Sequence, residues 1–248
     1  MTTDDKRLKG MKIEKQTASN QVFQAMKENI LNHGWKVGEK LPSEVELASI
    51  FGVNRLTIRM ALQKLNTLGI VETRVGDGTY VKNFEFESYI DEIQDLYADP
   101  KLIDDVCEFR KLIEIECARL SMERATPEEM VELEQICTKY EDLKAHMTIP
   151  VSPEELRSLV SMDIEFHFQI CKMSHNNLYI YAFSVAKGPI SQYVGLTLKQ
   201  RIDGWEKRNI SLLSGDYRHR AILDAIKKKD FELCKTLYDD MIDHTVEL

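Results

Sequence analysis

Apolar residues in the first third of the chain recur at the spacing of a short amphipathic helix. Between residues 20 and 33 they fall every three or four positions, at Val22, Phe23, Met26 and Ile30. This period places the side chains on one buried face of a helix. Ser19 or Asn20 can cap the start, because a short polar side chain accepts a hydrogen bond from a free backbone N–H, and Gly34 is expected to end the helix.

The next two segments, "SEVELASIFG" and "NRLTIRMALQKLNTLG", predict two more helices joined by a tight corner. Ser43 and Glu46 form a capping box, and Asn54 can cap the second helix. Gly52 and Gly69 stop the two helices. Two short helices with this connection are typical of a helix-turn-helix.

A β-hairpin is predicted directly after these helices. The β-prone runs "IVETR" and "TYVKN" flank the turn sequence "VGDG". Three helices followed by a hairpin predict a winged helix-turn-helix domain over residues 12–83.

From residue 84 onward the apolar pattern is helical throughout. The segment "LIDDVCEFRKLIEIECARLSMERA" predicts a long helix, whose inner face is expected to hold Val106, Phe109, Leu112, Ile113 and either Ile115 or Glu116. Thr126 before Pro127, and Ser152 before Pro153, mark the starts of two further helices, because proline is favoured at the first helical position.

Three more helices complete the predicted second domain. One starts near Asn177 and is expected to bend at Gly188-Pro189, and the last two cover Leu212–Lys228 and Asp230–Val246. The fold class is therefore mainly α: an N-terminal winged helix-turn-helix with a small β-hairpin, and a C-terminal all-α helical bundle over 84–248. Residues 84–100 are the expected coupling segment between the two domains.

Composition is that of a globular protein, with 43% hydrophobic and 30% charged residues. No apolar run approaches the roughly 18 residues of a membrane span, and the polar start lacks the apolar core of a signal peptide. We therefore expect a cytoplasmic protein with no membrane partner. The five cysteines are widely spaced without a C-x-x-C pair, which argues against a disulfide framework and a zinc ribbon.

The net charge of −8 is unevenly distributed along the chain. Residues 1–83 hold 13 Lys and Arg against 9 Asp and Glu, whereas the remaining residues hold 20 against 32. The first part is thus net positive by 4 and the second net negative by 12. This asymmetry favours a polyanion as the partner of the N-terminal domain, although solvated surface charge could produce the same pattern.

Basic and hydroxyl side chains cluster where a helix-turn-helix meets DNA. Arginine suits guanine, because its planar fork can donate to O6 and N7 together, and threonine can reach a phosphate or a base edge. Glycine at the hairpin turn lets the backbone approach a duplex closely. The predicted DNA-binding residues are Ser43, Arg55, Thr57, Arg59, Arg74 and Gly76.

The stretch "LPSEVELASIFGVNRLTIRMALQKLNTLGIVETRVGDGTYV" resembles the DNA-binding domain of the GntR family of bacterial transcription regulators. The resemblance places Arg55 and Arg59 at the two arginines of the recognition helix and Gly76 at the tip of the wing. It implies a homodimer that binds a palindromic double-stranded DNA operator. Val45 departs from the family, which commonly has a DNA-contacting arginine at that position.

Polar side chains interrupt the apolar faces of the C-terminal helices. Asp163 and His167 lie one turn apart on a stripe that is otherwise apolar, and His219 and His244 share faces with apolar residues on the last two helices. A buried carboxylate needs a partner. Carboxylate and imidazole together suit zinc, nickel or manganese, but hydrogen-bonded core residues would also explain the pattern.

Three segments, "EFRKLIEIECARLSM", "DIEFHFQICKMSHNN" and "HRAILDAIKKKD", resemble the FCD effector-binding domain of the FadR branch of GntR regulators. The resemblance implies a divalent metal held by one Asp and three His, with a small carboxylate effector that completes the coordination. Asp163, His167 and His219 match three ligand positions. Arg110 matches a position that lines the effector pocket, but it can equally pair with Glu114, four residues on.

The fourth ligand is irregular. The family's last histidine falls at Met241, and His244 lies three residues further on the same predicted face. Either the last helix is shifted in register and His244 binds, or the site has three protein ligands, or no metal is bound. His175 is a further candidate but better fits a loop, and Cys171 better fits packing than a ligand.

These observations predict an effector-responsive transcription regulator rather than an enzyme, because no nucleophile elbow, phosphate loop or paired-carboxylate signature stands out. Two alternatives remain open at this point. One is a metal-free sensor of a bulky ligand such as an acyl-CoA, and the other is a helical metalloenzyme with an accessory DNA-binding domain.

Overall fold

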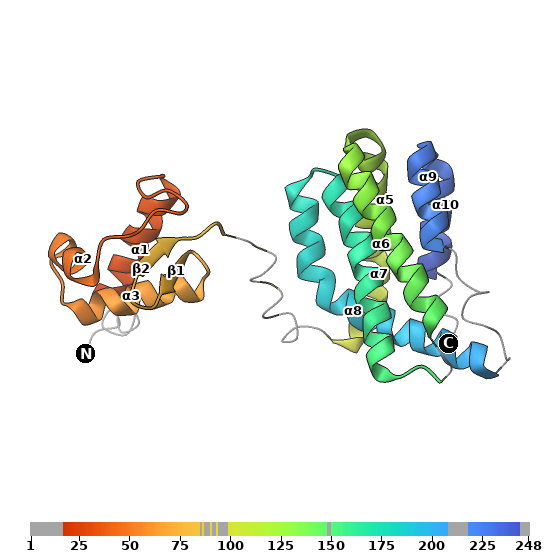
Figure 1. Ribbon diagram of the computed structural model, residues 1–248, viewed down its shortest axis with the longest axis horizontal. Helices are drawn as coiled ribbons and strands as arrows, with labels where there is room; N and C mark the ends of the chain where they lie inside the picture. The colour runs from red at the N-terminus through yellow and green to blue at the C-terminus, as the bar shows by residue number, and fades with distance from the viewer. Residues whose placement is uncertain are drawn as a thin grey trace, which may run out of the picture. The chain divides into compact units, whose positions relative to one another are not determined.

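The computed structural model of the protein (Figure 1) separates into two compact units, divided between residues 89 and 90. It describes residues 17–84, 86, 90, 93, 99–147, 150–207 and 218–243. No helix in these ranges is both long and apolar enough to cross a membrane. Most of the predicted coupling segment, residues 84–100, lies outside the described residues.

The first unit contains the predicted three helices and hairpin. Its elements are α1 (Ala18–Leu31), α2 (Glu44–Phe51), α3 (Arg55–Thr67), β1 (Val71–Arg74) and β2 (Gly78–Val81). The strands are antiparallel, with Val71 opposite Val81 and Arg74 opposite Gly78, and Lys40 adds an isolated bridge to Tyr80. Val22, Phe23, Met26, Leu47, Ile58 and Leu65 are among the buried residues that hold these elements together.

The ends of α1 differ from the prediction, while those of α2 and α3 agree with it. Thr17, not Ser19 or Asn20, caps α1: it is extended, and its side chain accepts from the backbone N–H of Asn20. At the other end His33 adopts the left-handed conformation, at φ +59°, ahead of Gly34. The Ser43 capping box, the Asn54 cap and the left-handed Gly52, at φ +63°, are confirmed.

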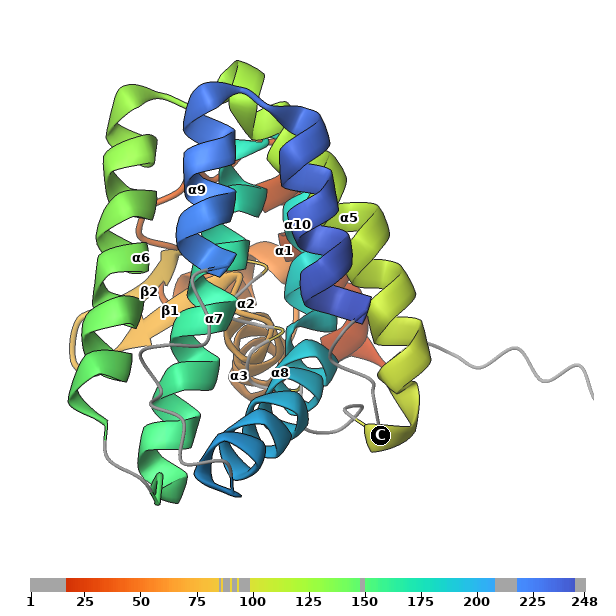
Figure 2. The same ribbon diagram turned by 90° about the vertical axis from the view of Figure 1, so that its right-hand side faces the viewer.

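The second unit is a helical bundle (Figures 1 and 2). Its helices are α5 (Ile103–Arg124), α6 (Pro127–His146), α7 (Pro153–Met173), α8 (Asn177–Lys207), α9 (Arg218–Lys228) and α10 (Phe231–Asp243), preceded by a short 3₁₀ turn, η2 (Pro100–Leu102). α7 packs against α5, α6 and α8, and α9 packs against α5, α6 and α10. Both predicted proline starts, at Pro127 and Pro153, are confirmed, each with a capping box.

Two predicted boundaries and one predicted bend concern the later helices. The predicted start of α9 at Leu212 lies outside the described residues, and α10 is described only to Asp243. Pro189 lies inside α8, and Figure 1 shows this helix changing direction along its course, as expected for a proline within a helix.

The buried face of α5 differs from the one that the apolar pattern predicts. Leu112 is 72% exposed, so its placement on the inner face was wrong. Arg110 and Glu114 are buried instead, together with Val106, Ile113 and Cys117. An ion pair between these two side chains, described below, allows the charged residues to take the inner face.

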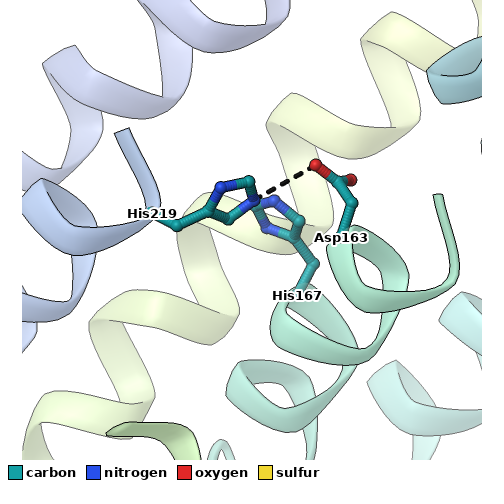
Figure 3. Close-up of side chains that lie close together, drawn as sticks. All are labelled: Asp163, His167 and His219. Atoms are coloured by element: carbon teal, nitrogen blue, oxygen red, sulfur yellow. Dashed lines mark ion pairs between the residues drawn. The ribbon is translucent and has the colours of Figure 1, made fainter. Parts of the chain in front are cut away.

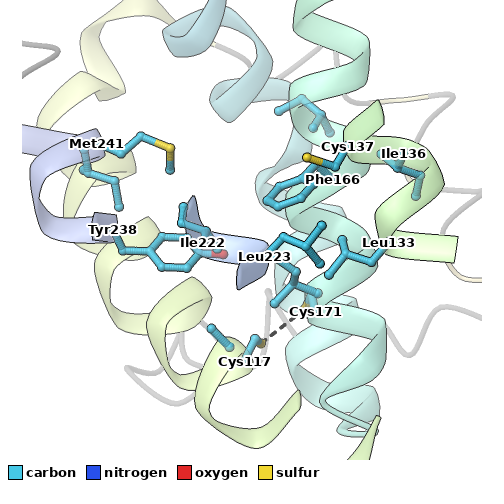
Figure 4. Close-up of a cluster of buried hydrophobic side chains, with 14 of the residues drawn as sticks. Cys117, Leu133, Ile136, Cys137, Phe166, Cys171, Ile222, Leu223, Tyr238 and Met241 are labelled. Carbon is cyan, nitrogen blue, oxygen red and sulfur yellow. Dashed lines mark hydrogen bonds between the residues drawn. The ribbon is translucent and has the colours of Figure 1, made fainter. Parts of the chain in front are cut away.

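The core of the bundle consists of apolar side chains that include residues from α5, α6, α7, α9 and α10 (Figure 4). The thiols of Cys117 and Cys171 lie 3.4 Å apart in it. All five cysteines are free, in agreement with the absence of a disulfide framework.

Candidate metal centre and DNA-binding surface

Asp163, His167 and His219 converge in the core of the bundle (Figure 3). α7 supplies Asp163 and His167 on successive turns, and α9 supplies His219. One ligand atom from each residue lies within 4.8 Å of the other two. The tertiary structure therefore brings together three of the four residues that the sequence singled out.

These three side chains are buried and incompletely paired. Their exposed fractions are 7%, 1% and 4%. Asp163 Oδ1 lies 3.1 Å from His219 Nε2, an ion-pair distance, although the two atoms do not meet hydrogen-bond geometry. Asp163 Oδ2, His167 Nε2 and His219 Nδ1 also lack hydrogen-bond partners among the described residues. Unpaired buried polar atoms are costly, and a cation among them would satisfy several at once.

The electrostatics of this cluster favour an ionised Asp163. Burial acts to raise the pKa of its carboxyl, but the adjacent His219, with the charges of His167 and Arg110, lowers that pKa well below its ordinary value. The rings of Tyr140 and Phe166 enclose His219, at centroid distances of 4.4 and 4.8 Å. The centre is thus a buried cluster with an ionised carboxylate, which suits a cation.

Glu114 lies behind His167 and was missed as a site residue in the sequence. Its Oε2 is 3.1 Å from His167 Nδ1, and the Tyr238 hydroxyl oxygen is 3.4 Å from the same nitrogen. When Nδ1–H donates to a carboxylate, the lone pair of the ring lies on Nε2, which is the unpaired atom. Metal-binding histidines commonly donate their other ring nitrogen in this way.

Arg110 forms an ion pair with Glu114, which was one of the two roles that the sequence suggested for it. Its Nε and Nη2 donate to Glu114 at 2.6 and 3.3 Å, and both side chains are almost fully buried. Burial acts to raise the pKa of Glu114, but Arg110 and His167 together lower it. The only sequence signal for this pair was its spacing, i and i+4 on one helix. A role of Arg110 in lining an effector pocket stays a prediction.

Two of the remaining candidate ligands, His175 and Cys171, are not part of this cluster. His244 lies outside the described residues, so the fourth ligand position is untested. Met241 is buried on α10 near Tyr238 (Figure 4). His175 is exposed on the loop after α7 and pairs with Glu129 at 2.9 Å. Cys171 contacts Cys117, as expected for a packing residue.

In the first unit α3 is the predicted recognition helix, and its N-terminal turns are exposed. Arg55 is exposed, and Thr57 donates its backbone N–H and its hydroxyl to the Asn54 side chain at 2.8 and 3.0 Å. Arg59 is also exposed, and its Nε and Nη2 donate to the two carboxylate oxygens of Glu44 at 2.9 and 2.8 Å. No local spacing rule predicts this pair, because 15 positions separate the residues.

The other predicted DNA-binding residues lie at the start of α2 and on the wing. Ser43 uses its hydroxyl in the capping box, where it accepts from the Glu46 N–H. Arg74 pairs with Glu72 at 3.1 Å and lies over the Tyr80 ring, 4.4 Å from its centroid. Gly76 occupies the turn with φ +78°, a left-handed conformation that favours glycine.

Comparison with known proteins identifies the class of both units. The model of the bacterial regulatory proteins of the gntR family matches residues 18–81, and the FCD domain model matches residues 105–244. The chain belongs to the GntR family of transcriptional regulators with an FCD domain. Its N-terminal domain is the DNA-binding domain, and its C-terminal domain is the effector-binding domain.

Individual relatives agree with this assignment. The Uxu operon transcriptional regulator of Escherichia coli K12 is 29% identical over 212 residues, which cover 83% of this chain and 76% of that protein. LutR of Bacillus subtilis 168, an HTH-type transcriptional regulator, is 33% identical over 150 residues, or 60% of this chain and 64% of LutR. The solved structure of a GntR protein from Streptococcus agalactiae has a TM-score of 0.61 and 28% identity, and it covers 91% of this chain and 98% of that chain.

Proposed function

We propose that the protein is a cytoplasmic, homodimeric regulator that binds a palindromic operator and responds to a small carboxylate effector. Asp163, His167 and His219 hold a divalent ion in its FCD domain. One observation supports the metal proposal: three buried ligand atoms, one from each residue, lie within 4.8 Å of one another. The His167 ring is oriented for binding, because its Nδ1 faces Glu114 and its Nε2 has no hydrogen-bond partner among the described residues. A bound zinc, nickel or manganese ion would supply coordination positions for a carboxylate.

The protein's own residues prepare this centre. Asp163 contributes negative charge, and Glu114 fixes the orientation and tautomer of the His167 ring through Nδ1. Arg110 neutralises Glu114, so the carboxylate behind His167 stays ionised without adding net charge. On the DNA side, Arg55, Thr57, Arg59 and the wing residues Arg74 and Gly76, with Ser43 at the start of α2, form the proposed contact surface.

Metal analysis of the purified protein tests whether the FCD domain binds a divalent ion. Protein prepared without chelator is expected to hold about one divalent ion per chain and to gain thermal stability when zinc, nickel or manganese is added after chelation. The His219→Ala variant should lose both properties. His175→Ala is the matched control, because His175 also pairs with a glutamate but lies outside the cluster. If the unmodified chain holds no metal and none of the three ions stabilises it, the metal proposal is wrong and the metal-free sensor is favoured.

A thermal-shift screen tests the effector class. Sugar acids, hydroxy acids and acyl-CoAs are added to metal-loaded and to chelated protein. A small carboxylate that completes the coordination should stabilise the loaded protein and have little effect after chelation. Stabilisation by acyl-CoA, equal in both preparations, would contradict the small-carboxylate proposal.

A further inference from the structure

The Arg59–Glu44 pair joins the recognition helix to the preceding helix at a fixed point. Glu44 is the first residue of α2, and the Ser43 capping box anchors that turn through hydrogen bonds to Glu46 in both directions. The side chain of Glu44 is 28% exposed and that of Arg59 is 53% exposed. A long, flexible side chain on α3 is therefore held by a carboxylate whose own backbone is well fixed.

The geometry of the pair leaves one edge of the guanidinium available. A guanidinium has five N–H donors in a planar fork. Glu44 takes the Nε and Nη2 edge, which lies nearer the helix. The terminal edge, formed by Nη1 and the second N–H of Nη2, has no protein partner among the described residues. Two parallel donors on that edge match the O6 and N7 acceptors of guanine in the major groove.

We propose that Glu44 is a positioning residue for DNA recognition, whose carboxylate holds the inner edge of Arg59 so that the terminal edge is presented to a guanine of the operator. This inference rests on the proposed role of Arg59 in base recognition. A side chain held in place loses less conformational entropy on binding, which favours the correct base. The negative charge of Glu44 also offsets that of Arg59, so it weakens sequence-independent attraction to phosphates.

The electrostatics of the pair are consistent with this role. The hydrogen bond from Arg59 lowers the pKa of the Glu44 carboxyl, so Glu44 is ionised at neutral pH. Were the pair a simple competitor of DNA, removal of Glu44 would free Arg59 and tighten operator binding. A positioning role predicts the opposite sign, and this difference makes the two accounts separable.

The experiment uses the full-length chain and two duplexes of equal length. One is selected by the unmodified protein from a random-sequence library, and the other is a scrambled version. Glu44→Gln removes the charge but keeps the shape of the side chain. Glu28→Gln is the matched control, since Glu28 is exposed on α1 and forms no ion pair with any described residue.

Relative to Glu28→Gln, Glu44→Gln should weaken binding of the selected duplex by about tenfold. Its affinity for the scrambled duplex should be unchanged or higher. Base preference should relax at one G·C pair in each half-site, which a merely structural defect would not produce. In the Arg59→Ala background, Glu44→Gln should have no further effect on the selected duplex, because the group that it positions is gone.

Three results distinguish the possible failures. If Arg59→Ala binds the selected duplex normally, the proposed base contact fails and this inference fails with it. If Arg59→Ala is defective but Glu44→Gln matches the control or binds more tightly, only the positioning role is overturned. Should Glu44→Gln not fold, Glu44→Asp keeps the acid in the first turn but shortens its reach, and normal base preference in that variant overturns the proposal.

Discussion

Both units of the protein contain a glutamate that receives the Nε and Nη2 donors of an arginine, and the two pairs lie in opposite environments. The side chains of Arg110 and Glu114 in the bundle are 4% and 1% exposed. Those of Arg59 and Glu44 in the DNA-binding domain are 53% and 28% exposed.

The difference in burial changes what each pair can do. The buried pair has lost its hydration, so each charge is stabilised mainly by the other. The Glu114 carboxylate also contacts His167 and orients its ring. The exposed pair keeps water around it and contributes little to folding, so its free donors remain available for a ligand. We propose that the same pair of side-chain types holds His167 in one unit and serves DNA recognition in the other.

The largest expected effect follows from removal of Glu114. Glu114→Ala leaves the Arg110 guanidinium buried without its partner, which should lower the free energy of unfolding by about 3–5 kcal/mol. Urea unfolding of metal-free protein measures this change. Glu116→Ala is the matched control on the same helix, because Glu116 pairs with Arg119 at a partly exposed position and should cost about 1 kcal/mol or less. Equal losses in the two variants would contradict the assigned importance of burial.

Metal affinity gives the next largest effect. His219→Ala removes a proposed ligand and should raise the metal dissociation constant at least about tenfold. If His244 is the fourth ligand, His244→Ala should produce a similar loss. Competition titrations with a chromophoric chelator compare the two variants. A normal dissociation constant for His244→Ala, beside a weakened His219→Ala, would show that the centre has three protein ligands.

Operator affinity depends on the exposed arginine itself. Arg59→Ala should weaken specific binding by roughly ten- to a hundredfold, because one bidentate contact to guanine is lost. Fluorescence anisotropy at physiological salt measures the change, and circular dichroism confirms that the fold is intact. Unchanged affinity in a folded variant would remove the recognition-helix assignment.

The smallest effect concerns stability of the DNA-binding domain. Glu44→Gln should leave the unfolding midpoint at neutral pH nearly unchanged, since the pair is exposed. The pKa of Glu44 is lowered in the folded state, so any stability from the pair is present at neutral pH and is lost as pH falls through that lowered pKa. Unfolding curves of the variant and the unmodified protein should therefore converge in acid. A large destabilisation that persists in acid would mean that Glu44 has a packing role.

The sequence was sufficient to predict those features whose interacting residues are close together along the chain. The capping box at Ser43, the caps at Thr126, Ser152 and Asn54, and the wing turn all involve partners within a few residues along the chain. The cap of α1 was wrong because Thr17, Ser19 and Asn20 are all suitable capping residues, and only the observed extended conformation of Thr17 distinguishes them.

Longer-range features needed the folded chain. The inner face of α5 was assigned from apolar periodicity, which favoured Leu112 over a charged pair. Burial of Arg110 and Glu114 is favourable only when they pair with each other and when Glu114 also contacts His167. His167 belongs to α7, a separate helix, so the sequence of α5 alone does not predict this contact. Likewise, no spacing rule links Glu44 to Arg59, since α2 and α3 bring them together through packing of their apolar faces.

The sequence by itself determined the helical content and singled out three of the residues at the candidate centre, because periodicity, caps and residue chemistry are written locally. Its resemblance to the GntR family indicated the class of protein. The tertiary structure alone decided that Asp163, His167 and His219 meet with unpaired atoms, and that Glu114 and Glu44 each hold a specific partner. Distances between helices arise from the packing of many side chains at once, and no single segment of the chain encodes them.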